Sequence, residues 1–139
     1  LVKGKCRPDL ISDDGNIIVD IKTTTDASPK GFQKSISTWG YHLQLAWYMR
    51  GLQKLGIPCN EFIFIAIEKT PPFSVGVYSA DREMILFGNQ EINKLVVDID
   101  KALSDKNFPD YTPEIMSLGL PPWMTEKKQQ PQHEDIELY

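Results

Sequence analysis

Short segments rich in apolar residues, bounded by turn residues, divide much of the sequence into predicted strands. Residues 2–11 and 17–22 predict two antiparallel strands, because the Asp-Gly pair at 14–15 between them is a strong hairpin signal. Residues 61–68 and 74–79 are rich in β-branched and aromatic residues and predict two further strands. The first of these is apolar on both faces, which is typical of a buried central strand, and the second is expected nearer an edge.

Helical patterns separate these strands. Ser28-Pro29 is a typical helix start, and Gly40 ends the first helix. A second helix is predicted over 41–55, where apolar residues recur at steps of three and four. A third helix is expected to begin at a cap formed by Asp81 and to end near Lys106. Its predicted apolar stripe consists of Ile92, Leu95, Val96, Ile99 and Leu103.

This order of elements predicts an α/β domain in which helices pack on a central mixed sheet. We expect residues 1–125 to form this core and the polar residues 126–139 to form a flexible tail. The longest apolar run, 62–67, is far too short to cross a bilayer. Cys6 and Cys59 are too few and too far apart for a disulfide framework, so we expect reduced thiols in a cytosolic protein.

Charge is distributed unevenly along the chain. The net charge of −4 argues at first against a nucleic-acid partner. Residues 1–54, however, hold eight Lys and Arg against five Asp and Glu, whereas the remainder is acidic. Since local potential matters more to a polyanion than total charge, the basic part could still bind nucleic acid.

The predicted hairpin places carboxylates opposite each other. If it turns about Asp14-Gly15, the numbers of paired residues sum to 29, so Asp9 faces Asp20 and Arg7 faces Lys22. Two like charges about 5 Å apart repel by roughly 3 kcal/mol at an effective dielectric constant of 20. A divalent cation between the carboxylates would turn this repulsion into binding, and oxygen ligands suit Mg²⁺ or Mn²⁺.

Lys22 is expected on the same face, close to such a cation, where it could orient an attacking water or neutralise a phosphate. An Asp–Asp–Lys set with a metal is what phosphodiester hydrolysis requires. A plainer interpretation also fits the pattern: Asp20 pairs with Arg7, while Asp9 and Lys22 are solvated. A β-bulge would change the pairing altogether.

Three motifs in order resemble the PD-(D/E)XK nuclease superfamily. They are Arg7-Pro8-Asp9, then Val19-Asp20-Ile21-Lys22, then the Gln44 to Tyr48 segment, which resembles the RecB-like branch. A closer resemblance, through CRPD, VDIKTT, YHLQLAWY and SLGLPPW, is to the C-terminal nuclease domain of RecE-type phage and prophage exonucleases (exodeoxyribonuclease VIII). It covers most of residues 5–125 and implies a restriction-endonuclease-like fold.

The resemblance implies a role for each matching residue. Asp9, Asp20 and the backbone carbonyl of Ile21 would bind Mg²⁺, or Mn²⁺, and Lys22 would be the catalytic lysine. Gln44 and Tyr48, which share a helix face, would help to hold the DNA end. Further candidates for substrate binding are Arg7, Thr23, Thr24, Lys30 and Lys34. The ordinary roles, helix packing for Tyr48 and solvation for the lysines, stay open.

The resemblance also implies a function: a magnesium-dependent exonuclease that degrades double-stranded DNA from its ends, 5′→3′, in phage-type recombination. It implies a homo-oligomeric ring, a single-strand-annealing partner protein, and the cytoplasm of a bacterial host, with a phage or prophage gene. The family's upstream helix, one strand and an acidic or histidine ligand are expected to be absent from this chain. A RecB-like endonuclease or repair nuclease and a non-catalytic DNA-binding module are the alternatives.

Overall fold

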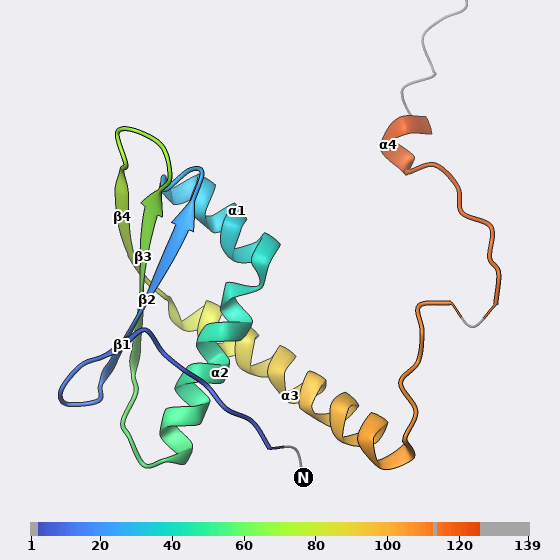
Figure 1. The fold of residues 1–139 in the computed structure, drawn as a ribbon, viewed down its shortest axis with the longest axis horizontal. Coiled ribbons are helices and arrows are strands. Elements are labelled where there is room, and N and C mark those ends of the chain that lie inside the picture. The colour runs from blue at the N-terminus through green and yellow to red at the C-terminus, as the bar shows by residue number, and fades with distance from the viewer. Residues whose placement is uncertain (1–2, 113, 126–139) are drawn as a thin grey trace, which may run out of the picture. The chain divides into compact units, whose positions relative to one another are not determined.

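The computed structural model describes residues 3–112 and 114–125 (Figure 1). The chain divides into two compact units, Leu1–Asn107 and Phe108–Tyr139. Every described strand lies in the first unit, and the described part of the second contains one short helix, α4 (Pro122–Thr125), which the sequence did not predict. The predicted flexible tail, 126–139, falls outside the described residues. Among the described helices, none is both long enough and apolar enough to span a membrane.

The first unit is built on a four-stranded mixed sheet. Its strands are β1 (Leu10–Ile11), β2 (Ile17–Thr24), β3 (Glu61–Glu68) and β4 (Val75–Ser79), side by side in that order. β2 and β3 are parallel, whereas β1 and β4 pair antiparallel to their neighbours. β3 is therefore internal and β4 lies at an edge, as the sequence predicted.

The hairpin between β1 and β2 has the predicted register. Leu10 pairs with Val19 and Ile11 with Ile18, so the numbers sum to 29. Gly15 has a positive φ of 73°, a conformation that glycine adopts without strain. The turn is held by side chains as well, since the backbone N–H of Ile17 donates to Ser12 Oγ at 2.9 Å.

β1 is much shorter than predicted, because the segment before it packs on a helix instead of on β2. The Lys5 carbonyl accepts a 3.0 Å hydrogen bond from the Trp47 indole. Gly4 lies so close to the same indole that an added Cβ would meet Cζ2 at 2.1 Å. Pro8, just before β1, has no N–H for a ladder. A strand over residues 2–11 was therefore the wrong prediction for the described residues before Leu10.

Three helices lie on one side of the sheet in Figure 1: α1 (Pro29–Trp39), α2 (Tyr41–Lys54) and α3 (Arg82–Asp105). Ser28 caps α1, its side chain accepting from the Gly31 N–H, and Gly40 ends that helix in a left-handed conformation. These boundaries agree with the sequence prediction to within one or two residues.

The hydrophobic core fills the space between this face of the sheet and the helices. Even-numbered residues of β2 and β3 point into it, as the alternation of a strand requires. Its largest fully buried members are Phe32, Phe62, Phe64, Ile18 and Leu45. Asp20 is also fully buried there, which makes it the one acidic side chain in this group.

The predicted apolar stripe of α3 is buried only in part. Ile92 is buried and Val96 packs against the core, whereas Leu95, Ile99 and Leu103 are exposed. α3 packs against α2, but Figure 1 shows the two helices diverging, so the second half of α3 has less to pack against. The mixed sheet with helices on it nevertheless confirms the predicted α/β class.

Candidate active site

The candidate site forms where the middle of β2 faces α2. Asp20 lies on the helix side of β2, with its Cα paired to that of Phe64 in β3. Asp20 as a whole is only 1% exposed. The sequence pattern Ile18, Asp20, Lys22 therefore directs two charged residues into a face that is largely apolar. Such burial of a carboxylate is costly unless a cation or hydrogen-bond donors compensate for it.

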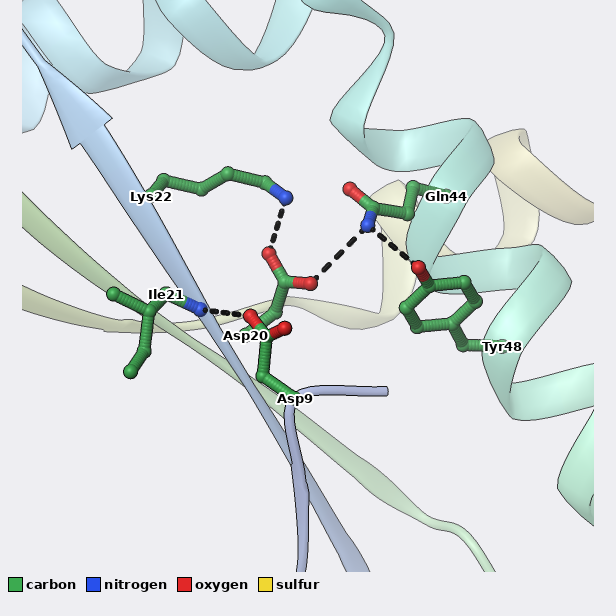
Figure 2. A network of polar contacts seen from close by, with 6 residues as sticks. All are labelled: Asp9, Asp20, Ile21, Lys22, Gln44 and Tyr48. Carbon is green, nitrogen blue, oxygen red and sulfur yellow. Dashed lines mark hydrogen bonds and ion pairs between the residues drawn. The ribbon is translucent and has the colours of Figure 1, made fainter. Parts of the chain in front are cut away.

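Asp9 reaches the same place from the segment just before β1. Its Oδ2 accepts a hydrogen bond of 2.9 Å from the backbone N–H of Ile21. The ladder stops at Leu10, so this bond replaces the next rung and holds Asp9 beside the open edge of β2. Figure 2 shows the two carboxylates next to each other, as the register predicts.

Lys22 neutralises much of the charge of Asp20. Its ammonium forms an ion pair with Asp20 Oδ2, an atom with no other polar partner among the described residues. The same ammonium lies 4.7 Å from the centre of the Tyr41 ring, a cation–π contact. Lys22 is thus held between the strand and the start of α2, and the interpretation in which it is merely solvated does not fit.

Gln44 fixes the other oxygen of Asp20. Its Nε2 donates both to Asp20 Oδ1, at 3.1 Å, and to the Tyr48 hydroxyl, at 3.0 Å (Figure 2). Gln44 and Tyr48 lie one helical turn apart on α2 and share a face, as predicted. Gln44 therefore determines the orientation of the Asp20 carboxylate, and Tyr48 in turn orients the amide of Gln44.

The surroundings of Asp20 favour its neutral form. Burial raises the pKa of this carboxyl above its usual value, the hydrogen bond and charge of Lys22 act in the opposite direction, and the negative charge of Asp9 adds to the increase. A perturbed carboxyl next to a second carboxyl is typical of functional sites, because folding alone gains nothing from it.

These groups fit a hard divalent cation. The carboxylates of Asp9 and Asp20 are neighbours, and both offer oxygen, the ligand that Mg²⁺ and Mn²⁺ prefer (Figure 2). The N–H and C=O of one residue in a strand point to the same side, so the Ile21 carbonyl points to the open edge where Asp9 binds the Ile21 N–H. Within residues 3–112 and 114–125, no group of three or more Asp, Glu, His and Cys side chains could hold a metal.

The remaining predicted site residues differ in position. Arg7 is exposed. The hairpin register predicted that Arg7 pairs with Lys22, but β1 begins only at Leu10, so this pair does not form. Thr24 is buried, and its hydroxyl contacts Asp26 and Ser35, which ties the end of β2 to α1. Thr23, by strand alternation, points to the face opposite Asp20.

Lys30 and Lys34 are exposed on α1, one turn apart and therefore on one side of the helix. Both side chains are accessible to a phosphate in this position. Their role in substrate binding stays a prediction.

Tyr41 is the residue that the sequence reasoning missed. It begins α2 three residues before Gln44 and seven before Tyr48. This is the spacing of residues on one helix face, so the same rule that joined Gln44 to Tyr48 could have included it. Its contact with Lys22, in contrast, joins α2 to β2 and has no signature in the sequence.

Comparison with known proteins agrees with this geometry. Residues 2–118 match the family described as "PDDEXK-like domain of unknown function (DUF3799)". No curated protein matches the sequence. A crystal structure named "putative exonuclease", from Eubacterium rectale, is similar in fold over 83% of this chain, with a TM-score of 0.57 and 15% identity. The matched part is 48% of that protein, so this chain spans about half its length.

The structural likeness confirms the restriction-endonuclease-like fold expected from the sequence, and the family match covers most of the chain. Together they support the superfamily that the three motifs resemble, without distinguishing its RecE-type branch. The chain belongs to the family of PDDEXK-like domains.

Proposed function

We propose that this chain is a metal-dependent deoxyribonuclease whose site is formed by Asp9, Asp20 and Lys22. The observation that carries the proposal is the buried Asp20, held by Lys22 and Gln44 directly beside Asp9. Family membership and the fold support a nuclease. The cation would be Mg²⁺, or Mn²⁺, held by the two carboxylates and the Ile21 carbonyl. When bound, it would activate water and stabilise charge on a phosphate.

The other residues act through position. Gln44 keeps Asp20 Oδ1 in place, and Asp9 is kept in place by the Ile21 N–H. Lys22 supplies a positive charge to the phosphate and can orient the attacking water. Tyr41 limits where the Lys22 ammonium can lie, since its ring attracts the cation. Arg7, Lys30 and Lys34 would add contacts to DNA phosphates.

The finer form of the proposal rests on the resemblance to RecE-type exonucleases. In this form the substrate is an end of double-stranded DNA, degraded 5′→3′ during recombination of a phage or prophage in the cytoplasm of its host. A homo-oligomeric ring and a single-strand-annealing protein are the proposed partners. The name of the similar Eubacterium rectale protein is consistent with exonuclease action.

The experiment uses linear duplexes labelled at either the 5′ or the 3′ ends, a closed circular duplex, and Mg²⁺ or Mn²⁺. We expect mononucleotides from the linear duplexes, with the 5′ label released first, and an intact circle. Asp20→Asn should abolish the release. Cleavage of the circle would establish an endonuclease instead. No hydrolysis by the unchanged chain with either metal, or equal hydrolysis by Asp20→Asn, would refute the proposal.

One observation favours a second candidate, a non-catalytic DNA-binding module: the described residues supply only two carboxylates to the site. In that case the unchanged chain and Asp20→Asn would bind DNA equally and neither would hydrolyse it. The retained Lys22–Asp20–Gln44 arrangement argues for the enzyme, because a binding module gains nothing from a buried carboxylate.

A further inference from the structure

A groove of about 420 Å³ lies between α2 and the segment that precedes Asp9. Three of the side chains that line it are basic, namely Lys5, Arg50 and Lys54, and none is acidic. Its lining also includes the apolar side chains of Trp47 and Leu55. In a chain of net charge −4, such a concentration of positive charge creates a local potential that attracts anions.

Close packing fixes the two walls of the groove. Gly4 lies on Trp47, whose indole donates to the Lys5 carbonyl, and Cys6 Sγ would be only 2.7 Å from a Cβ added to Gly51. The guanidinium of Arg50 is held by a 2.7 Å hydrogen bond that it donates to the side-chain oxygen of Asn93 in α3. Arginine has five N–H donors, so this bond leaves others for a ligand.

Both walls lead to the candidate active site. The segment that carries Lys5 reaches Asp9 four residues later, and α2 carries Gln44 about three turns and Tyr48 about two turns before Lys54. At 1.5 Å per residue, Tyr48 and Lys54 are about 9 Å apart along the helix. A DNA strand rises about 3.4 Å per nucleotide, so the groove could follow two to three phosphates.

A second hollow of the same unit has the opposite character. It is lined by Asp81, Glu83, Gln90 and apolar residues of α3, with no basic side chain. The basic residues are therefore not a general feature of the concave surfaces of this unit, and they line the hollow whose two walls continue along the chain to Asp9 and to Tyr48.

We propose that this groove holds one strand of DNA next to the phosphodiester bond that the site hydrolyses. Phosphates contact Lys5, Arg50 and Lys54, and a sugar or base lies over Trp47 and Leu55. The volume of the groove is within the range that holds ligands of nucleotide size. This inference rests on the proposed function, since it names the path of the same substrate.

The test is the binding of a fluorescein-labelled, 12-nucleotide single strand, followed by anisotropy in EDTA over a range of salt. In Lys5→Ala/Lys54→Ala we expect affinity to fall at least tenfold. The slope of log K against log salt should fall by about 1.4, since each lost phosphate contact removes about 0.7. The matched control is Lys69→Ala/Lys101→Ala, which removes two exposed lysines outside the groove lining and should behave like the unchanged chain.

A second measurement locates the DNA. Trp39 and Trp123 are 71% and 66% exposed, so replacing both by Phe leaves Trp47 as the one remaining tryptophan at little structural cost. We expect the same oligonucleotide to quench its fluorescence. Unchanged affinity and salt slope in the Lys5/Lys54 variant, or an unchanged Trp47 signal at saturation, would overturn the inference.

The outcomes also separate the two proposals. Binding that depends on the groove, without any hydrolysis, would refute the nuclease and leave the groove as a DNA site. Hydrolysis that depends on Asp20, with binding unaffected by the groove substitutions, would refute the groove and leave the nuclease.

Discussion

Three aspartates, six residues apart, lie before, within and after β2, and their surroundings differ. Asp14 and Asp26 are exposed in the turns, where hydroxyl and backbone N–H donors of nearby residues, with Ser12 and Ser28 foremost, lower their pKa values. Asp20 is buried in the middle of the strand, where burial raises its pKa. The turn carboxylates stabilise the local structure. Burial of the charged Asp20 carboxylate, in contrast, costs free energy of folding.

This contrast indicates how structural and functional carboxylates can be distinguished in this chain. A structural one accepts hydrogen bonds from residues two positions away, as Asp14 does from Ser12 and Asn16. Asp20 instead interacts with Gln44, which is distant in sequence, and with Lys22, whose ammonium is also held by a residue of another element. Substitutions at the three positions should therefore separate activity from stability.

The largest effect is expected from Asp20→Asn. Loss of a charged metal ligand should reduce the rate of DNA hydrolysis by about a thousandfold or more, equivalent to about 4 kcal/mol of transition-state stabilisation. Asp14→Asn and Asp26→Asn are the matched controls and should keep the rate of the unchanged chain. Similar losses in all three variants would remove the distinction between the site and the turns.

Lys22→Ala comes next, with an expected loss of about 10²–10⁴ in rate. Lys22 also holds down the pKa of Asp20, so this variant should raise that pKa further. The acidic limb of the pH–rate profile should consequently move to higher pH in any activity that remains. A profile unchanged in both height and position would show that Lys22 does not act on Asp20.

A smaller effect is expected at Tyr41. Tyr41→Leu removes a cation–π contact with Lys22, worth about 0.5–1 kcal/mol, and should slow hydrolysis about two- to fivefold. Tyr41→Phe keeps the aromatic ring and should retain nearly full rate. If the rate of hydrolysis falls as much in the Phe variant as in the Leu variant, the Tyr41 hydroxyl, and not the face of its ring, supports the reaction.

Ser28→Ala should affect stability alone. Its hydroxyl accepts from the Gly31 N–H at the start of α1, and loss of such a cap costs about 1 kcal/mol in unfolding free energy. Urea denaturation measures this cost, and DNA hydrolysis at a temperature where both proteins are folded should not change. A decrease in rate there would mean that α1 contributes directly to the site.

The smallest effect is a difference in the pH dependence of stability, measured in the absence of metal. The pKa of Asp26 is lowered from 3.8, so its contribution is present above that pH and lost as the pH falls through the lowered value. The pKa of Asp20 is raised, so its contribution is complete below 3.8 and lost as the pH rises through the raised value. Relative to the unchanged chain, Asp20→Asn should therefore gain stability as the pH rises from 3.8, and Asp26→Asn should not.

Much of the site could be predicted, because its determinants are local. The Asp14-Gly15 turn sets the register, and the register sets Asp9 beside Asp20. The alternation of the strand then places Lys22 on the same face, and helical spacing places Gln44 next to Tyr48. Each of these steps needs only the sequence over a few residues.

The rest depends on contacts between distant segments. Residues before Leu10 have strand-like sequence, but Gly4 and Lys5 are held by Trp47, more than 40 positions away. For the same reason the sequence could not show that Lys22 meets the ring of Tyr41. The exposure of Leu103 likewise depends on which elements pack against the second half of α3, and the apolar pattern of α3 alone does not specify them.

The most direct test of the central claim is paramagnetic broadening of NMR signals by Mn²⁺. A cation between Asp9 and Asp20 should broaden the backbone amide of Ile21 and the side-chain amide of Gln44 first. The turn amides of Asn16 and Ser28 should stay sharp at the same Mn²⁺ concentration. Asp20→Asn should abolish the effect at Ile21 and Gln44. Broadening confined to the turns, or equal in the variant, would contradict a metal site at Asp9 and Asp20.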